Sequence, residues 1–324
     1  MRARRCSRTS STCQGTEKHE LRILLTGVSG QVGGALRAPL TALGEVVPAD
    51  RTNMDLSKPE LISSALDAVR PDLIVNPAAY TAVDRAEQEA EMAYRVNAEA
   101  PRALAEWAAR HKIPLIHFST DYVFDGSGDQ PWREDDPTGP LSIYGASKLA
   151  GEVAVKGAGG DHLIIRTAWV FAAQGRNFLT TIARLARERS ELRVVVDEIG
   201  APTSAEIIAR GVIAMLSSEN GKVHDIPGRF GSVGGLVHLC ASGTASWFDF
   251  ARAIVDGLRG HEEKLAVRQV TAIKSSDYPT RVKRPKNSRL DMSRLRLALR
   301  IETPDWQEGV EQEIHKFCML AKRE

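Results

Sequence analysis

Residues 21–33, LRILLTGVSGQVG, decide the fold of this chain. The first six residues form a short apolar run typical of a buried strand, and residues 31–43 have the pattern of a helix. Between them, Gly27, Gly30 and Gly33 allow a sharp turn and the close approach of a pyrophosphate, whose charge would face the amides at the helix start. The flanking strand and helix favour a dinucleotide site over a tight turn without a ligand.

The alternation of apolar strands and helices continues beyond this turn. Further short strands are expected at residues 45–49, 72–76, 113–118 and 162–166. Helical patterns lie between them, at residues 58–70 and 85–111 and from Tyr144 onward. Such alternation predicts a parallel sheet that is covered by helices on both faces.

The pattern becomes mixed after residue 170. Helices are expected at residues 177–188, 205–217, 246–258 and 305–321. Strands are expected at residues 192–196 and 236–239, and the glycine-rich residues 221–235 are expected to form a hairpin or loop. We therefore predict an α/β protein, a Rossmann-type doubly wound parallel sheet with a smaller α+β substrate-binding lobe.

The length of 324 residues exceeds that of a typical single domain. We expect an NAD(P)-binding Rossmann domain at residues 21–170 and mainly the substrate-binding lobe at 171–324, with some later segments returning to the first domain. Residues 1–20 hold five basic and two acidic side chains and almost nothing apolar. Such a segment is expected to be a disordered basic extension, which we favour over a transit peptide.

The composition argues against several classes of function, namely nucleic-acid binding, membrane spanning and metal binding by cysteines. The net charge of +2 gives no bulk reason to expect nucleic acid as a partner. No apolar run reaches the roughly 18 residues that a membrane span requires. The four cysteines show no metal-ligand spacing, so we expect free thiols in a reducing cytoplasm and no metal site.

A hydroxyl and a Tyr-x-x-x-Lys pair form the candidate catalytic group. Thr120 ends the fourth expected strand, and Tyr144 and Lys148 share one helix face. A free tyrosine has a pKa near about 10, and a nearby ammonium such as that of Lys148 is expected to lower it. Tyr144 would then act as the general acid that protonates a carbonyl oxygen, and Thr120 would hydrogen-bond that oxygen. The Tyr144–Lys148 pair follows the strand that ends at Thr120 after a single loop. This position favours a catalytic role over a pair on the helix surface without a function.

Several residues are candidates for holding the cofactor. Asp50 follows the second strand, where an acidic residue commonly binds the adenosine ribose of NAD, but Arg51 could instead hold a 2′-phosphate. These signals conflict, and we lean to NADPH with NADH as an alternative. Asp55 and Leu56 could line the adenine, although Asp55 equally fits a helix N-terminal acid. The remaining expected cofactor neighbours follow the third strand and are Ala79, Tyr80 and Thr81.

Candidate substrate residues lie just beyond strand ends, where open α/β sheets bind ligands. Asp121 could bond a sugar hydroxyl, Trp169 could stack on the sugar or wall it off, and Tyr122 lies beside them. Alternatively, Asp121 is a carboxylate that stabilises a turn, and Trp169 and Tyr122 are aromatic residues of the core. The basic residues 281–289 could meet a pyrophosphate or could form a solvated charged face.

Longer runs of the chain resemble the dTDP-4-dehydrorhamnose reductase family. They are Val75–Asp84, Ser119–Gly126, Tyr144–Glu152, Arg166–Phe171, Gly200–Thr203, Ala241–Thr244 and Arg284–Leu290. The resemblance covers about residues 21–318. It implies an extended short-chain dehydrogenase with a nucleotide-sugar-binding lobe. The implied reaction reduces the C4 keto group of dTDP-4-dehydro-L-rhamnose, the last step of dTDP-rhamnose biosynthesis for polysaccharides.

The resemblance also implies roles for single residues. Thr120, Tyr144 and Lys148 fall on the family's catalytic positions, and Thr120, Asp121 and Trp169 on its sugar-nucleotide positions. Its cofactor positions correspond to Gly30, Gln31, Val32, Asp55, Leu56, Ala79, Tyr80, Thr81, Tyr144 and Lys148. Some members dimerise through magnesium held by a glutamate, where this chain has Ala35, which argues against magnesium. A monomer or a homodimer is expected.

Two other interpretations compete with a reductase. The chain also resembles the non-catalytic beta subunit of methionine adenosyltransferase, a regulatory protein that keeps the fold and the nucleotide binding. The complete catalytic set, together with Asp121 and Trp169, favours the enzyme. A related epimerase or dehydratase is disfavoured, because dehydratases usually carry a glutamate where this chain has Tyr122.

Overall fold

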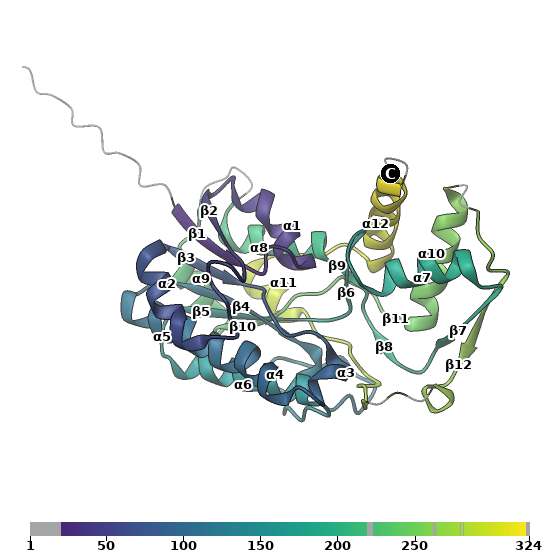
Figure 1. The fold of residues 1–324 in the computed structure, drawn as a ribbon, viewed down its shortest axis with the longest axis horizontal. Helices are drawn as coiled ribbons and strands as arrows, with labels where there is room; N and C mark the ends of the chain where they lie inside the picture. Colours follow the sequence, from purple (N-terminus) through teal and green to yellow (C-terminus); the bar gives the residue numbers. More distant parts are fainter. Residues whose placement is uncertain (1–20, 219–222, 262–263, 279, 281, 322–324) are drawn as a thin grey trace, which may run out of the picture.

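The structure is a computed structural model that describes residues 21–218, 223–261, 264–278, 280 and 282–321. A larger part is built around one six-stranded sheet, and a smaller part lies beside it (Figure 1). The expected disordered extension at residues 1–20 lies outside the described residues. Within the described ranges, no helix is both long enough and apolar enough to cross a membrane.

The six strands of the central sheet are all parallel and have the order β10-β5-β4-β3-β1-β2. They are β1 (Leu21–Thr26), β2 (Gly44–Ala49), β3 (Leu73–Asn76), β4 (Leu115–Thr120), β5 (His162–Thr167) and β10 (Leu236–His238). The strand order reverses direction beside β1, where open α/β sheets bind ligands at the carboxyl ends of their strands. The predicted α/β fold with a parallel Rossmann-type sheet is confirmed.

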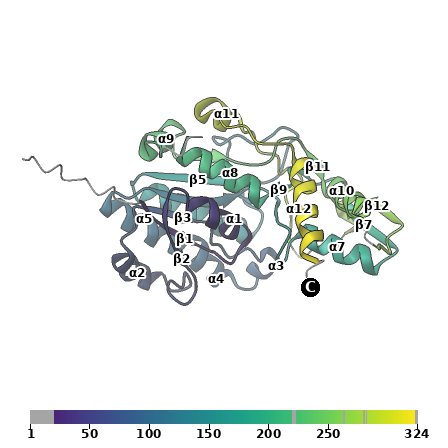
Figure 2. The ribbon, with the colours of Figure 1, turned by 90° about the horizontal axis from the view of Figure 1, so that it is seen from above.

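Helices cover both faces of the sheet because successive strand residues point to opposite sides. Ile23 and Leu25 pack toward one set of helices, and Leu24 packs toward the other. The first set is α1 (Gln31–Leu40), α8 (Ala205–Leu216), α9 (Ile226–Ser232) and α11 (Ser293–Leu299). The second set is α2 (Ile62–Val69), α5 (Ala100–His111) and α6 (Ile143–Gly157). Figure 2 shows α9 and α11 on one side of the sheet and α2 on the other.

The smaller part has its own apolar core. Phe171, Phe250 and Val310 lie in that core, which is enclosed by α7 (Phe178–Glu188), α10 (Trp247–Gly260) and α12 (Trp306–Ala321). A parallel pair, β7 (Glu191–Val195) with β12 (Gln269–Ile273), forms its outer edge (Figure 1). Two shorter pairs lie nearer the central sheet: β6 (Val170–Phe171) with β9 (Thr203–Ser204), and β8 (Ile199–Gly200) with β11 (Ala245–Ser246).

Two local expectations were wrong. The expected hairpin or loop at residues 221–235 contains helix α9, whose first turn is capped by the Asp225 side chain and whose Ile226 and Phe230 reach the core; residues 221 and 222 lie outside the described residues. The expected helix at residues 85–111 is divided into α3 (Val83–Ala86), α4 (Ala90–Tyr94), the π-helical turn η2 (Arg95–Glu99) and α5. Core contacts of Ile226 and Phe230 stabilise a helix where the local pattern predicted none, whereas the helix predicted at residues 85–111 is interrupted.

Candidate active site

The glycine turn is packed so tightly that side chains are excluded from it. Gly27 has φ +59°, and a Cβ atom there would lie 2.9 Å from the Ala78 Cα atom. A Cβ atom on Gly33 would lie 2.2 Å from the Gly27 carbonyl oxygen. The Gly30 amide donates to that same carbonyl at 2.9 Å and starts α1. The turn therefore brings backbone amides to the end of β1, as a phosphate site requires.

Gln31 supplies an unsatisfied polar atom at this place. Its Oε1 atom is buried and has no hydrogen-bond partner among the described residues. The next residue, Val32, packs against the apolar core under α1. A buried acceptor without a partner costs free energy unless a ligand or water satisfies it. The start of α1 thus has the form of a binding cradle.

The acidic candidates near the end of β2 are held in local turns. The Asp50 carboxylate accepts from the Thr52 amide at 2.7 Å and from its hydroxyl at 2.5 Å, and these bonds lower the pKa of Asp50. The Asp55 carboxylate accepts from the Ser57 hydroxyl at 2.7 Å, and its pKa is lowered chiefly by that bond. Arg51 is exposed between them.

Leu56 lies in the core rather than on an open surface. It is buried and packs with the apolar cluster under α2 and α5. Its side chain is shielded from solvent and belongs to the same cluster as Met54 and Ile62.

The loop after β3 is fixed by a residue that the sequence analysis missed. The Asn97 carboxamide in η2 accepts from the Tyr80 amide at 2.8 Å and donates to the Tyr80 carbonyl at 3.1 Å and to the Ser147 hydroxyl at 3.0 Å. The Tyr80 hydroxyl donates to Glu89. Asn97 thereby ties the loop that contains Ala79 and Thr81 to Ser147 on α6. A buried asparagine inside a helical pattern is the signal that could have pointed to Asn97.

Thr120 and Asp121 form a buried pair at the carboxyl end of β4. The Thr120 hydroxyl donates to Asp121 Oδ1 at 3.0 Å and accepts from the Tyr122 amide at 3.2 Å. Asp121 is 2% exposed, and burial raises the pKa of its carboxyl group to about 6. Its Oδ2 atom has no hydrogen-bond partner among the described residues. This oxygen is available to a ligand hydroxyl.

Tyr144 and Lys148 lie on α6 directly after the Ser142 cap, whose hydroxyl accepts from the Gly145 amide at 3.1 Å. Burial raises the pKa of Tyr144 to about 12, and a hydrogen bond with Thr120 acts in the opposite direction. The Lys148 Nζ atom donates to the Phe118 carbonyl at 2.5 Å, and burial lowers the pKa of Lys148 to about 8.

The expectation that Lys148 lowers the pKa of Tyr144 was wrong. Removal of the phenol from water outweighs any attraction to the ammonium, which is engaged with a backbone carbonyl. Tyr144 is consequently protonated at neutral pH, which is the state that a proton donor requires. Its ring meets that of Tyr122 edge to face, with centroids 5.5 Å apart.

Trp169, just after β5, has a strained backbone. Its φ of +49° is an outlier for a bulky side chain and costs on the order of 1–3 kcal/mol. Its indole ring stacks on that of Trp247 at 3.6 Å with an interplanar angle of 9°. Its carbonyl accepts from the Thr203 amide at 3.1 Å. The smaller part of the molecule therefore sets the conformation of Trp169.

The basic candidate segment crosses between the two parts, and its first residue, Arg281, lies outside the described residues. Arg284 pairs with Asp84 at 3.5 Å, and Lys286 pairs with Asp197 at 3.4 Å. Arg284 is half-buried, and its Nε atom has no hydrogen-bond partner within the described part of the chain. It is thus a cation with donor capacity left for a ligand.

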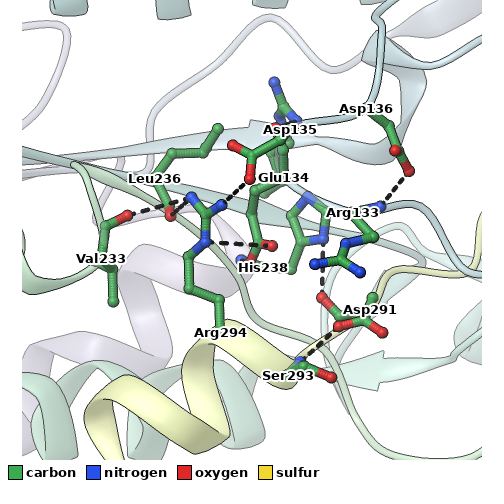
Figure 3. Close-up of polar contacts among 11 residues, drawn as sticks. Arg133, Glu134, Asp135, Asp136, Val233, Leu236, His238, Asp291, Ser293 and Arg294 are labelled. Atoms are coloured by element: carbon green, nitrogen blue, oxygen red, sulfur yellow. Dashed lines mark hydrogen bonds and ion pairs between the residues drawn. The ribbon is translucent and has the colours of Figure 1, made fainter.

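A second polar cluster that the sequence analysis missed secures the end of this segment (Figure 3). Glu134 accepts from the His238 amide at 3.1 Å and pairs with Arg294 at 3.6 Å. The His238 ring contacts the Asp291 carbonyl through Nδ1 at 3.1 Å, and Arg294 also pairs with Asp135. The cluster joins β10, the loop after β4 and the chain that follows the basic segment. Its only sequence signal is a histidine inside an apolar strand.

His238 makes a testable contribution to acid stability. Burial lowers the pKa of His238 to about 3. Between pH 6.5 and pH 3 the unfolded state binds a proton that the folded state rejects, so the free energy of unfolding falls as the pH falls through this window. We expect His238→Asn, which keeps a donor for the Asp291 carbonyl, to reduce this slope by up to about 1.4 kcal/mol per pH unit.

Urea unfolding from pH 4 to pH 7 measures this slope. The control is His315→Asn, which changes an exposed imidazole on α12. The raised pKa values of Asp121 and Glu134 act in the opposite direction, but they are present in every variant compared. An equal change of slope in both variants would contradict the assignment to His238.

Comparison with known proteins agrees with this geometry. The family model described as RmlD substrate binding domain matches residues 21–319. The dTDP-4-dehydrorhamnose reductase of Escherichia coli (strain K12) is 42% identical over 301 residues, which cover 92% of this chain and 98% of that protein. The enzyme of the same name from Burkholderia thailandensis is 45% identical over 292 residues, covering 90% and 97%.

A solved structure shows the same similarity. The dTDP-4-dehydrorhamnose reductase from Bacillus anthracis, in complex with NADP, matches with a TM-score of 0.79 at 32% identity, covering 92% of this chain and 99% of that one. Sequence and structure comparisons thus confirm the resemblance noted from the sequence motifs. The chain belongs to the RmlD family of dTDP-4-dehydrorhamnose reductases.

Proposed function

We propose that this protein reduces the C4 keto group of dTDP-4-dehydro-L-rhamnose to form dTDP-L-rhamnose, with NADPH as the hydride donor and NADH as a possible substitute. One observation carries the proposal: Thr120, Asp121, Tyr144 and Lys148 converge where β4 ends and α6 begins. In a member of this family, such a group supports carbonyl reduction. The product would serve polysaccharide biosynthesis in the cytoplasm.

The residues at the end of β1 fit a dinucleotide. The glycine turn formed by Gly27, Gly30 and Gly33 leaves no room for side chains. The buried Gln31 Oε1 atom has no hydrogen-bond donor among the described residues, so a bound dinucleotide could supply one. Ala79, Tyr80 and Thr81 would border the cofactor, with Asp50, Arg51, Asp55 and Leu56 near its adenosine end. The bound nicotinamide supplies the hydride. Among the described residues, no group of three His, Cys, Asp or Glu side chains could hold a metal ion.

Tyr144 would donate its phenolic proton to the C4 oxygen. Its raised pKa keeps the proton in place until negative charge develops on that oxygen. The Thr120 hydroxyl would hold the same oxygen, as a positioned donor does in an oxyanion site. Lys148, anchored at the Phe118 carbonyl, has further N–H groups for the nicotinamide ribose.

The substrate would lie across the two parts of the molecule. Asp121 would accept a sugar hydroxyl, with Tyr122 and Trp169 bounding the sugar, and Arg284 would face the diphosphate. We place the dinucleotide in residues 21–170 and the nucleotide sugar mainly in residues 171–324, from which β10, α8, α9 and α11 return to the larger part. A monomer or a homodimer would suffice for this arrangement.

The test is NADPH oxidation by the purified protein with dTDP-4-dehydro-L-rhamnose, together with product identification. We expect dTDP-L-rhamnose to form in an amount equal to the NADPH consumed. The UDP-linked sugar, assayed in parallel, identifies the nucleotide carrier. Tight NADPH binding without oxidation would overturn the proposal in favour of the regulatory-subunit alternative, to which the relatives reported above give no support.

Arg51→Ala tests the cofactor preference. Removal of an exposed cation that meets the 2′-phosphate should raise the KM for NADPH about 5- to 10-fold and leave the KM for NADH nearly unchanged. Arg110→Ala, which removes an exposed arginine from α5, serves as the control. Equal effects on the two cofactors would exclude a 2′-phosphate contact by Arg51.

A further inference from the structure

Trp169 does not set its own orientation. Its φ of +49° is unfavourable for a bulky residue, so surrounding contacts must hold it there. Trp247 covers the indole by parallel stacking at 3.6 Å. The backbone of Gly200 lies against the same ring, because a Cβ atom there would come within 2.6 Å of Trp169 Cε2. These two contacts fix the position of the ring.

Trp247 is itself held by neighbours both near and remote in the sequence. Its indole N–H donates to Glu198 Oε2 at 3.1 Å. Ser246 caps α10 through a reciprocal pair of hydrogen bonds with Asp249, and its strand β11 pairs with β8. The ring of Phe178 packs at 4.6 Å from the Trp247 ring. Backbone, ring and N–H of Trp247 are therefore all restrained.

Glu198 connects this aromatic pair to the basic segment. It is 9% exposed, and burial raises the pKa of its carboxyl group, while the charge of Arg284 acts in the opposite direction. The charge of Arg284 also opposes the rise in the Tyr122 pKa that burial causes. A single buried carboxylate thus fixes the indole N–H of the Trp169–Trp247 stack, and it feels the charge of Arg284 in the basic segment.

We propose that Trp247 and Glu198 are positioning residues for the nucleotide sugar. Trp247 holds the Trp169 indole in place at the edge of the sugar pocket, and Glu198 holds Trp247 through its indole N–H. The role rests on the proposed reductase function, since it assigns a substrate to the same site. Trp247 and Glu198 would thus contribute to substrate binding without contacting the reacting atoms or the glycine turn that holds the cofactor.

Trp247→Leu is the central variant. Loss of the stacking partner should raise the KM for dTDP-4-dehydro-L-rhamnose about 3- to 10-fold, with a smaller change in kcat and an unchanged Kd for NADPH. Glu198→Leu should reproduce this pattern, whereas Glu198→Gln, which keeps an acceptor for the indole N–H, should largely restore the KM. Trp107→Phe is the control, because Trp107 also donates to a carboxylate, that of Asp67 at 2.8 Å, but lies on α5.

Circular dichroism supplies a readout that is independent of turnover. All five tryptophans lie in the described part of the chain, and Trp169 with Trp247 is the one Trp–Trp stack there. The exciton couplet of that stack should disappear in Trp247→Leu and persist in Trp107→Phe. A folded Trp247→Leu protein that loses the couplet but keeps the wild-type KM would overturn the proposal. So would an equal loss of affinity for NADPH, which would indicate a general structural role.

Failure of the reductase function would be recognised separately. A wild-type protein that binds the nucleotide sugar without oxidising NADPH would overturn the reaction, and the Kd for the sugar would then replace KM in the same comparison. A wild-type protein that does not bind the nucleotide sugar at all would overturn both proposals.

Discussion

Tyr144→Phe should lower kcat by about 10²- to 10⁴-fold, which is the range that a positioned proton donor contributes. The substitution removes one oxygen atom and keeps the ring against Tyr122 at the start of α6. The glycine cradle and Lys148 are unchanged, so the Kd for NADPH should stay within about twofold, because little binding energy is lost with the hydroxyl. The expected result is a protein that binds its cofactor but does not turn over.

Stopped-flow NADPH oxidation and a fluorescence titration with NADPH measure the two quantities. Tyr94→Phe is the matched control, since it removes a tyrosine hydroxyl from α4 outside the proposed catalytic group. Retained turnover in Tyr144→Phe would remove Tyr144 from the mechanism. A parallel loss of NADPH binding would instead show that the phenol supports the shape of the site.

Glu152→Gln should lower the free energy of unfolding by about 3–5 kcal/mol, as expected when one partner of a buried ion pair is removed. Glu152 accepts two hydrogen bonds from Arg166, at 2.8 and 2.7 Å, and a third from the Ser119 hydroxyl at 2.6 Å. Arg166 also lies over the Phe124 ring at 5.0 Å. The neutral amide would leave the guanidinium charge buried and uncompensated between β5 and α6.

Urea unfolding at neutral pH measures the loss. Glu188→Gln is the control, because it breaks the exposed Arg184–Glu188 pair at 2.7 Å and should cost only about 0.3–0.5 kcal/mol. Similar small losses in both variants would show that Arg166 finds another partner. Because Ser119 directly precedes Thr120, we also expect lower activity in Glu152→Gln, even at temperatures where it remains folded.

Short-range patterns accounted for much of this protein. Apolar strands alternating with helices predicted the parallel sheet, because side-chain periodicity depends only on backbone geometry. The glycine spacing predicted the turn before α1, where a Cβ atom on Gly33 would have no room. The order of Thr120, Tyr144 and Lys148 predicted that they would meet, since a strand end followed by a helix leaves few arrangements. The family resemblance followed from the same local runs.

Long-range contacts decided the rest. Burial, not the neighbouring lysine, determined the direction of the Tyr144 pKa shift, and no sequence pattern reports how much water surrounds a phenol. The stack of Trp169 on Trp247 and the hydrogen bond from the His238 amide to Glu134 join segments that are distant in the chain. Sequence by itself predicted most of the elements and the chemical groups of the candidate site. Only the tertiary structure decided their protonation and orientation, because both depend on desolvation and packing by residues far away in the sequence.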